Sequence, residues 1–159
     1  MVVFIQNKKI KETKASEPIE EIDIKTQLLR EFDDAYRKDV PITTGEIKEF
    51  DIVASVEYVE IMPGKKVEVW SYNGIVPGPK LEVNLGDTLK VNFKNELPQD
   101  TTIHWHGVRV PNAMDGVPGV TQEPIKSGES FVYEFVPKDA GTFWFHPHVR
   151  TSEQLGRGL

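Results

Sequence analysis

The only four histidines of the chain stand in two pairs, each with one residue between its members. The first pair is His104 and His106 in TTIHWHGVRV, and the second is His146 and His148 in FHPH. Neutral imidazole is the commonest metal ligand in proteins. A single pair of this kind is compatible with two ordinary surface residues. Chance would place all four histidines in two such pairs in roughly one sequence in two thousand of this composition, so the pattern predicts a metal site.

The spacing within each pair favours a cluster of metal ions over a single ion. Side chains two positions apart on a strand point to the same face, so His104 and His106 share one face and Trp105 takes the other. Such residues are separated by about 6.5 to 7 Å along the strand, which is awkward for one closed tetrahedral zinc site. Imidazole suits zinc, copper, iron and nickel. Four imidazoles cannot saturate two or three ions, so further ligands are expected from elsewhere.

The elements that must position these histidines are strands. From residue 46 onward, apolar and polar residues alternate with a period of two between turn formers, which predicts an all-β sandwich or barrel. Residues 101–110 and the segment GTFWFHPH are read as two of these strands. The other alternating positions are Phe50, Ile52, Ala54, Val56 and Tyr58; Val67, Val69 and Ser71; Leu81, Val83 and Leu85; Leu89, Val91 and Phe93; and Phe131, Tyr133 and Phe135.

The first 45 residues differ in pattern from the rest. Residues 1–15 are rich in lysine and are interpreted as a loosely held arm. Residues 17–38 are predicted to form a helix with one apolar face, flanked by Pro18 and Pro41, and that face is expected to pack against the core. The prediction is therefore an arm and helix over residues 1–45, followed by a β domain over residues 46–159.

Composition excludes several other classes of protein. The chain of 159 residues is long enough for one domain with a substantial core. Its net charge of −6 argues against nucleic acid as a partner. No apolar run reaches the length of a membrane span, and no signal peptide is visible. The chain has no cysteine, so neither a disulfide framework nor thiolate chemistry is available.

Three segments carry a resemblance to a known family. They are WSYNGIVPGPKLEVNLGDTLKVNFKNEL, TTIHWHGVRVPNAMDGVPGVTQEPIKSGESFVYEF and AGTFWFHPHVRTSEQLGRGL. With the motifs HWHG, MDGVP and HPH in this order, the chain resembles the first cupredoxin domain of a multicopper oxidase. That family includes laccases, bacterial copper-efflux oxidases and ascorbate oxidase. The resemblance covers about residues 46–159 and implies a cupredoxin-like Greek-key β-sandwich.

The resemblance also implies an activity and a set of ligands. The family couples one-electron oxidation of its substrates to four-electron reduction of O₂ to water. Its trinuclear copper cluster lies between the first and last domains, each of which supplies two histidine pairs. Matching the motifs makes His104 the ligand of the type 2 copper, and His106, His146 and His148 ligands of the type 3 pair. Asp115 of MDGVP matches a carboxylate thought to deliver protons through water; the alternative is an ordinary turn residue.

Two departures from the family pattern limit what this chain could do alone. Without cysteine it cannot build the type 1 copper centre, which needs a His, Cys, His set. It also stops at GRGL, where the family continues into a final strand. The resemblance therefore implies the N-terminal part of a longer, laccase-like copper oxidoreductase. The remaining cupredoxin domains are expected on a second or downstream polypeptide.

Several properties of the complete protein follow only from the family. The resemblance implies a periplasmic or extracellular enzyme and a phenolic or metal-ion reductant, and the sequence does not distinguish between these reductants. A second interpretation stays open, in which the chain is a stand-alone copper-binding module without turnover. An HCH motif and two further histidine pairs in the accompanying polypeptide would decide between the two.

Overall fold

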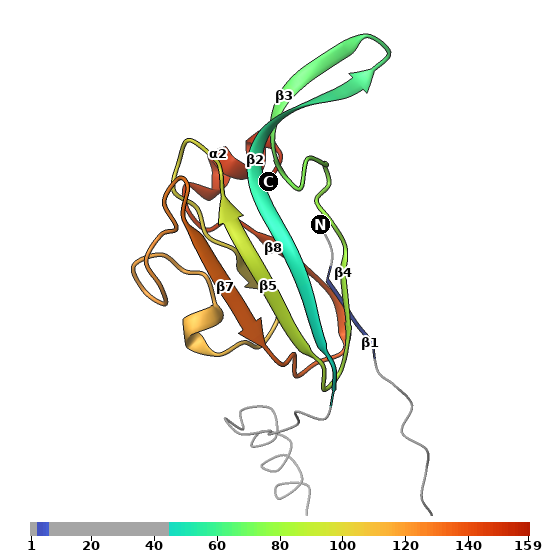
Figure 1. Ribbon diagram of the computed structural model, residues 1–159, viewed down its shortest axis with the longest axis vertical. Coiled ribbons are helices and arrows are strands. Elements are labelled where there is room, and N and C mark those ends of the chain that lie inside the picture. The colour runs from blue at the N-terminus through green and yellow to red at the C-terminus, as the bar shows by residue number, and fades with distance from the viewer. Residues whose placement is uncertain (1–2, 7–44) are drawn as a thin grey trace, which may run out of the picture.

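The computed structural model describes residues 3–6 and 45–159, which form two four-stranded sheets (Figure 1). The strand order is β4-β1-β8-β6 in the first sheet and β3-β2-β5-β7 in the second. The predicted helix over residues 17–38 lies outside the described residues. The elements are β1 (Val3–Gln6), β2 (Ile47–Met62), β3 (Lys65–Tyr72), β4 (Leu81–Asn84), β5 (Thr88–Asn95), β6 (His104–His106), the 3₁₀ turn η1 (Asn112–Met114), β7 (Ser130–Phe135), β8 (Gly141–His146) and α2 (Thr151–Arg157).

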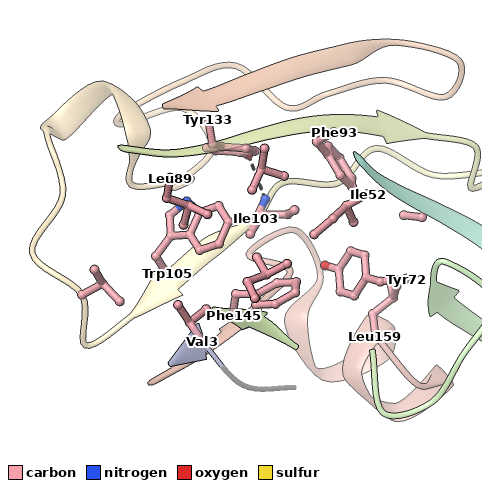
Figure 2. Packing of buried hydrophobic residues seen from close by; sticks show 14 of the residues in the cluster. Val3, Ile52, Tyr72, Leu89, Phe93, Ile103, Trp105, Tyr133, Phe145 and Leu159 are labelled. Atoms are coloured by element: carbon pink, nitrogen blue, oxygen red, sulfur yellow. Dashed lines mark hydrogen bonds between the residues drawn. The ribbon is translucent and has the colours of Figure 1, made fainter. Parts of the chain in front are cut away.

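An aromatic core joins the two sheets (Figure 2). Trp105 of β6 is fully buried, and its ring centroid lies 5.5 Å from that of Tyr133 on β7 in the opposite sheet. Phe145 of β8 lies 5.5 Å from Trp105 on the other side. Large aromatic side chains bury the most apolar surface per residue, so they dominate the energetics of such a core. The prediction of an all-β sandwich is confirmed.

The predicted alternation holds best on β5 and fails at the far ends of β2 and β3. Leu89, Val91 and Phe93 are all buried, as expected. Tyr58, in contrast, is 66% exposed, because β2 pairs with β5 only as far as Ala54 and continues as a two-stranded ribbon with β3. The ribbon extends beyond the sandwich (Figure 1), so its side chains have no opposite sheet to cover them.

On β3, only one of the three residues expected to be buried from the alternation, Ser71, is fully buried. Trp70 and Tyr72 belong to the buried cluster, whereas Val67 and Val69 are only partly buried. The sequence interpretation followed the valines because they alternate with charged residues. The larger aromatic side chains occupy the face toward the opposite sheet, which buries more apolar area.

Part of the expected N-terminal arm is a strand. β1 lies between β4, to which it is parallel, and β8, to which it is antiparallel. Val3 is 1% exposed and belongs to the core cluster. Residues 3–6 therefore belong to the sandwich, in contrast to the prediction of a loosely held arm over residues 1–15. The division of the chain at residue 45 stays a prediction.

A short helix, α2, follows the second histidine pair and was not predicted. It packs on β3, where the guanidinium carbon of Arg157 lies 4.7 Å from the centroid of the Trp70 ring. Leu159, just beyond the helix, is buried beside Tyr72 (Figure 2). Seven residues show too little periodicity to predict a helix, and a helix this short depends on tertiary contacts for its stability.

Candidate metal centre

Antiparallel pairing of β6 with β8 brings the two histidine pairs together. His104 lies opposite His146, and His106 lies opposite Trp144. Trp105 points into the core while both β6 histidines lie on the other face, as the strand pattern predicted. Strand β6 has only three residues, so most of the predicted strand over residues 101–110 is irregular. The two HxH motifs, distant in sequence, thus become one side-chain cluster.

The closest imidazoles in this cluster come from different pairs. The ring centroid of His104 lies 5.2 Å from that of His146 and 5.3 Å from that of His148. Within the pairs the separations are longer, 5.9 Å for His104–His106 and 6.2 Å for His146–His148. One ligand atom from each of His104, His106 and His146 lies within 4.8 Å of the other two. Ions held here would be shared across the two strands.

Backbone carbonyls orient two of the rings. Nδ1–H of His104 donates to the carbonyl oxygen of Asp115 at 2.7 Å, and Nδ1–H of His146 donates to that of Pro147 at 2.9 Å. A carbonyl oxygen only accepts, so in both rings the proton is on Nδ1 and the lone pair is on Nε2. Such a bond from the second ring nitrogen fixes the orientation of a metal-binding imidazole. Nε2 of His146 lies 3.3 Å from Nδ1 of His106, inside the cluster.

The cluster suits a metal that binds neutral nitrogen ligands. Burial lowers the pKa of His146 below its ordinary value, and the neighbouring imidazoles lower this pKa further. A lowered pKa keeps the ring neutral at neutral pH, which is the form that binds metals. The donor set of clustered neutral imidazoles fits copper, for which imidazole is a preferred ligand.

The MDGVP loop is packed directly against the start of β6. Gly116 has a φ of +74°, and a Cβ atom added there would lie 1.8 Å from the carbonyl oxygen of Ile103. This close approach brings Asp115, which precedes it, beside His104: Oδ1 of Asp115 lies 3.4 Å from Nδ1 of His104. On the core side, N–H of Ile103 donates to the Tyr133 hydroxyl at 2.9 Å, drawn as a dashed line in Figure 2. The first histidine is therefore held from both sides.

Trp144 is a neighbour of the cluster that the sequence interpretation missed. Its ring centroid lies 4.3 Å from that of His146 and 4.8 Å from that of His106, with interplanar angles of 32° and 31°. The side chain is nevertheless 40% exposed. It also lines an apolar groove together with Val76 and Leu155, both partly exposed. The available signal was its position two residues before His146, which places both side chains on the same face of a strand.

The chain is similar to known proteins in both sequence and fold. The model of a family described as multicopper oxidase matches residues 54–159. Laccase-1 of Cryptococcus neoformans var. grubii is 45% identical over 117 residues, which are 72% of this chain and 18% of that protein. Copper resistance protein A of Escherichia coli is 40% identical over 108 residues, which are 68% of this chain and 18% of that protein. The crystal structure of the multi-copper oxidase from Pseudomonas thermotolerans superimposes with a TM-score of 0.70 at 46% identity, over 73% of this chain and 28% of that one.

The sandwich and its paired histidines define a cupredoxin-like domain with a candidate copper centre. The chain belongs to the multicopper oxidase family, and membership implies copper binding. It spans less than a fifth of the length of the curated relatives described above, 18% in both cases. In the described residues, no helix has the length and apolar character needed to cross a membrane.

Proposed function

We propose that the chain supplies half of the ligands of a trinuclear copper cluster in a laccase-like oxidase. The complete enzyme would couple one-electron oxidation of its substrate to four-electron reduction of O₂ to water. The observation that carries the proposal is the convergence of two HxH motifs from paired strands, His104 opposite His146. A second observation supports it: the Nδ1–H groups of these two rings are held by carbonyls, which leaves Nε2 of each available for a metal.

The role of each residue follows the family pattern. His104 would bind the type 2 copper, and His106, His146 and His148 would bind the type 3 pair. Copper held by these residues would provide the redox chemistry that passes the substrate's electrons to O₂. Asp115 would hold a proton at its carboxylate for delivery to reduced oxygen, since proton transfer needs a titratable group nearby. Its side chain is 32% exposed and lies beside His104, so it faces both solvent and the cluster.

The rest of the enzyme would cover the exposed side of the histidine cluster. His106 and His148 are exposed in this chain, and Trp144 adds an exposed aromatic surface beside them. We propose that a further cupredoxin domain docks here and brings the remaining imidazoles. A polypeptide with the missing cysteine would hold the type 1 copper, at which a phenol or a metal ion is oxidised. Such an enzyme would be exported to the periplasm or beyond the cell.

A chimera would test the proposed activity. Residues 54–159 of this chain would replace the matching segment of E. coli copper resistance protein A, and O₂ consumption would be followed with a phenolic reductant and with cuprous ion. Consumption of O₂ without release of hydrogen peroxide is the expected result, because four electrons reach each O₂ molecule. A chimera that also carries His104→Ala and His146→Ala should lose this activity. Full activity of that double variant would contradict the proposal.

The second candidate function is copper binding without turnover. It is favoured by three histidines of this one domain, His104, His106 and His146, whose ligand atoms already lie within 4.8 Å of one another. A folded chimera that binds a full complement of copper but consumes no O₂ would support this alternative. Copper content is measured by atomic absorption and folding by circular dichroism. If the chimera is misfolded, residues 54–159 would instead replace the matching segment of the multi-copper oxidase from Pseudomonas thermotolerans.

A further inference from the structure

The four histidines are not held in the same way. His104, His106 and His146 lie in the paired strands β6 and β8, so the sheet ladder determines where they are. His148 follows Pro147, beyond the last residue of β8, and its side chain is exposed. Its backbone N–H donates to Oγ1 of Thr102 at 3.3 Å, a long hydrogen bond. The position of the fourth imidazole therefore depends on what holds the segment after β8.

That segment leads into α2, which is anchored by a fully buried glutamine. Gln154 has an exposed fraction of 0%. Its Oε1 accepts a hydrogen bond from Oγ1 of Thr101 at 2.7 Å, and its Nε2 donates to the carbonyl oxygen of Asp100 at 2.9 Å. Hydrogen bonds away from water are strong, and losing one leaves a buried polar group unsatisfied. The amide joins the helix after the second histidine pair to residues 100–101, just before the first pair.

We infer that Gln154 is a positioning residue for His148. By fastening α2 to residues 100–101, it fixes where the chain runs after Pro147, and so where the fourth imidazole lies relative to His104. The strand ladder cannot do this, because it ends at His146. A helix of seven residues has little stability of its own, so it takes its position from such contacts.

A neighbouring contact of α2 serves as the control for the hydrogen bonds of Gln154. Nε2 of Gln99 donates to Oε1 of Glu153 at 3.2 Å, next to the buried pair but on the outside of the same helix. The Glu153 side chain is 31% exposed and also forms ion pairs with Arg150 and Arg157. Water can replace such a contact, so Glu153→Gln should leave the helix in place. Gln154→Met, which keeps the side-chain length and removes both hydrogen bonds, should displace it.

The first measurement is the ¹H–¹⁵N spectrum of the imidazole rings in the metal-free chain. Because the chain has only four histidines, the four ring systems can be assigned individually through His→Ala variants. In Gln154→Met, the His148 ring signals should shift and broaden while those of His104 stay in place. In Glu153→Gln, all four should stay in place. Unchanged His148 signals in Gln154→Met, or equal shifts of all four rings, would overturn the inference.

The second measurement is copper(II) affinity, and only this part rests on the proposed function. Gln154→Met should weaken binding about tenfold, the lower end of the effects of groups that orient ligands. In a His148→Ala background the same substitution should have no further effect, because the residue that it positions is absent. Equal weakening in both backgrounds would mean general destabilisation and would contradict the inference.

Two further results keep this inference separate from the proposed function. If Gln154→Met does not fold, Thr101→Val removes only the hydroxyl partner of the glutamine and should produce the same selective change at His148. If the folded chimera with copper resistance protein A consumes no O₂, the proposed function fails. The ring spectra still decide whether Gln154 positions His148.

Discussion

At the scale of single residues, the centre depends on backbone atoms as much as on imidazoles. The proton on Nδ1 of His104 is directed to a carbonyl oxygen of the MDGVP loop, which leaves Nε2 for a metal. That loop can approach β6 only because Gly116 has no side chain and accepts a positive φ. The glycine is thus part of the apparatus that orients the first histidine.

Gly116→Ala should therefore damage both stability and metal binding. The alanine Cβ would meet the Ile103 carbonyl at 1.8 Å, and the backbone would be strained at φ +74°. Together these effects should lower the free energy of unfolding by about 3 kcal/mol and weaken copper binding at least about tenfold.

The control is Gly119→Ala, which has a similar φ of +71° but open space around its Cβ. Gly119→Ala should lower the free energy of unfolding by about 1 kcal/mol and leave copper affinity unchanged. Urea unfolding and copper titration would test both variants. Equal effects of the two substitutions would argue against the role of the close approach between Gly116 and the Ile103 carbonyl.

Asp115→Asn separates the side chain of Asp115 from its backbone. The carbonyl that accepts the His104 proton is retained, so copper affinity should stay within about twofold of the original. The variant loses the titratable group, so the chimera should reduce O₂ about a hundredfold more slowly. Asp51→Asn, an exposed change on β2, is the control for altered charge. Unaltered reoxidation of fully reduced Asp115→Asn enzyme would rule out proton delivery by this carboxylate.

At the scale of elements, a turn between β4 and β5 is closed by a buried carboxylate. Asp87 is 5% exposed. It accepts hydrogen bonds from N–H of Glu46 and from N–H and Nδ2 of Asn84, at 2.9 to 3.0 Å. Burial raises the pKa of Asp87, but these hydrogen bonds outweigh it, and the pKa lies below its ordinary value. The ionised carboxylate therefore stabilises the folded state, since it links the start of β2 to the β4–β5 turn.

Asp87→Asn should destabilise the protein in a pH-dependent way. An amide has one acceptor oxygen in place of two, so at pH 7 the variant should lose about 1 to 3 kcal/mol of unfolding free energy. The pKa of Asp87 is lower in the folded state than in the unfolded state. Its contribution to the free energy of unfolding is therefore fully present above the pKa of the unfolded state, about 4. This contribution is lost as the pH falls through the lower pKa of the folded state. Urea unfolding between pH 7 and pH 3 should therefore show the two proteins converging in acid. Glu123→Gln, at an exposed position, should show no such convergence.

At the scale of the whole molecule, the metal would connect distant parts of one sandwich. One histidine pair lies on β6 and the other at the end of β8, segments that come together only when the sheet forms. A ligand that binds only the folded state stabilises it by mass action. Metal binding and folding should therefore be coupled in this chain.

Copper should raise the unfolding temperature, and the histidines should be necessary for this. At a free copper concentration one hundred times the dissociation constant, the stabilisation is about 2.7 kcal/mol. For a domain of this size that corresponds to a shift of about 5 to 10 °C. Differential scanning calorimetry of the chain with and without copper(II) measures the shift. His104→Ala with His146→Ala should abolish it, and a persistent shift in that variant would place the copper elsewhere.

How much the sequence alone could predict differs between the fold and the site. The period-two alternation of Leu89, Val91 and Phe93 predicts their burial, because every second side chain of a strand points to the same face. The same reasoning placed Trp105 opposite the histidines. It failed for Tyr58, since exposure there depends on where the opposite sheet ends. It also did not place β1, whose partners β4 and β8 are distant in sequence.

For the site, the sequence by itself determined the ligand chemistry: four histidines in two HxH pairs and no cysteine. Residue types and local spacing are written directly in the chain, and strand geometry relates them without further information. Only the tertiary structure decided which imidazoles meet and what orients them. The pairing of His104 with His146, the carbonyl of Asp115 and the buried amide of Gln154 are contacts between residues 11 to 53 positions apart in the sequence. Such contacts are decided by how the sheets pack and which buried polar groups find partners, and no local pattern records that outcome.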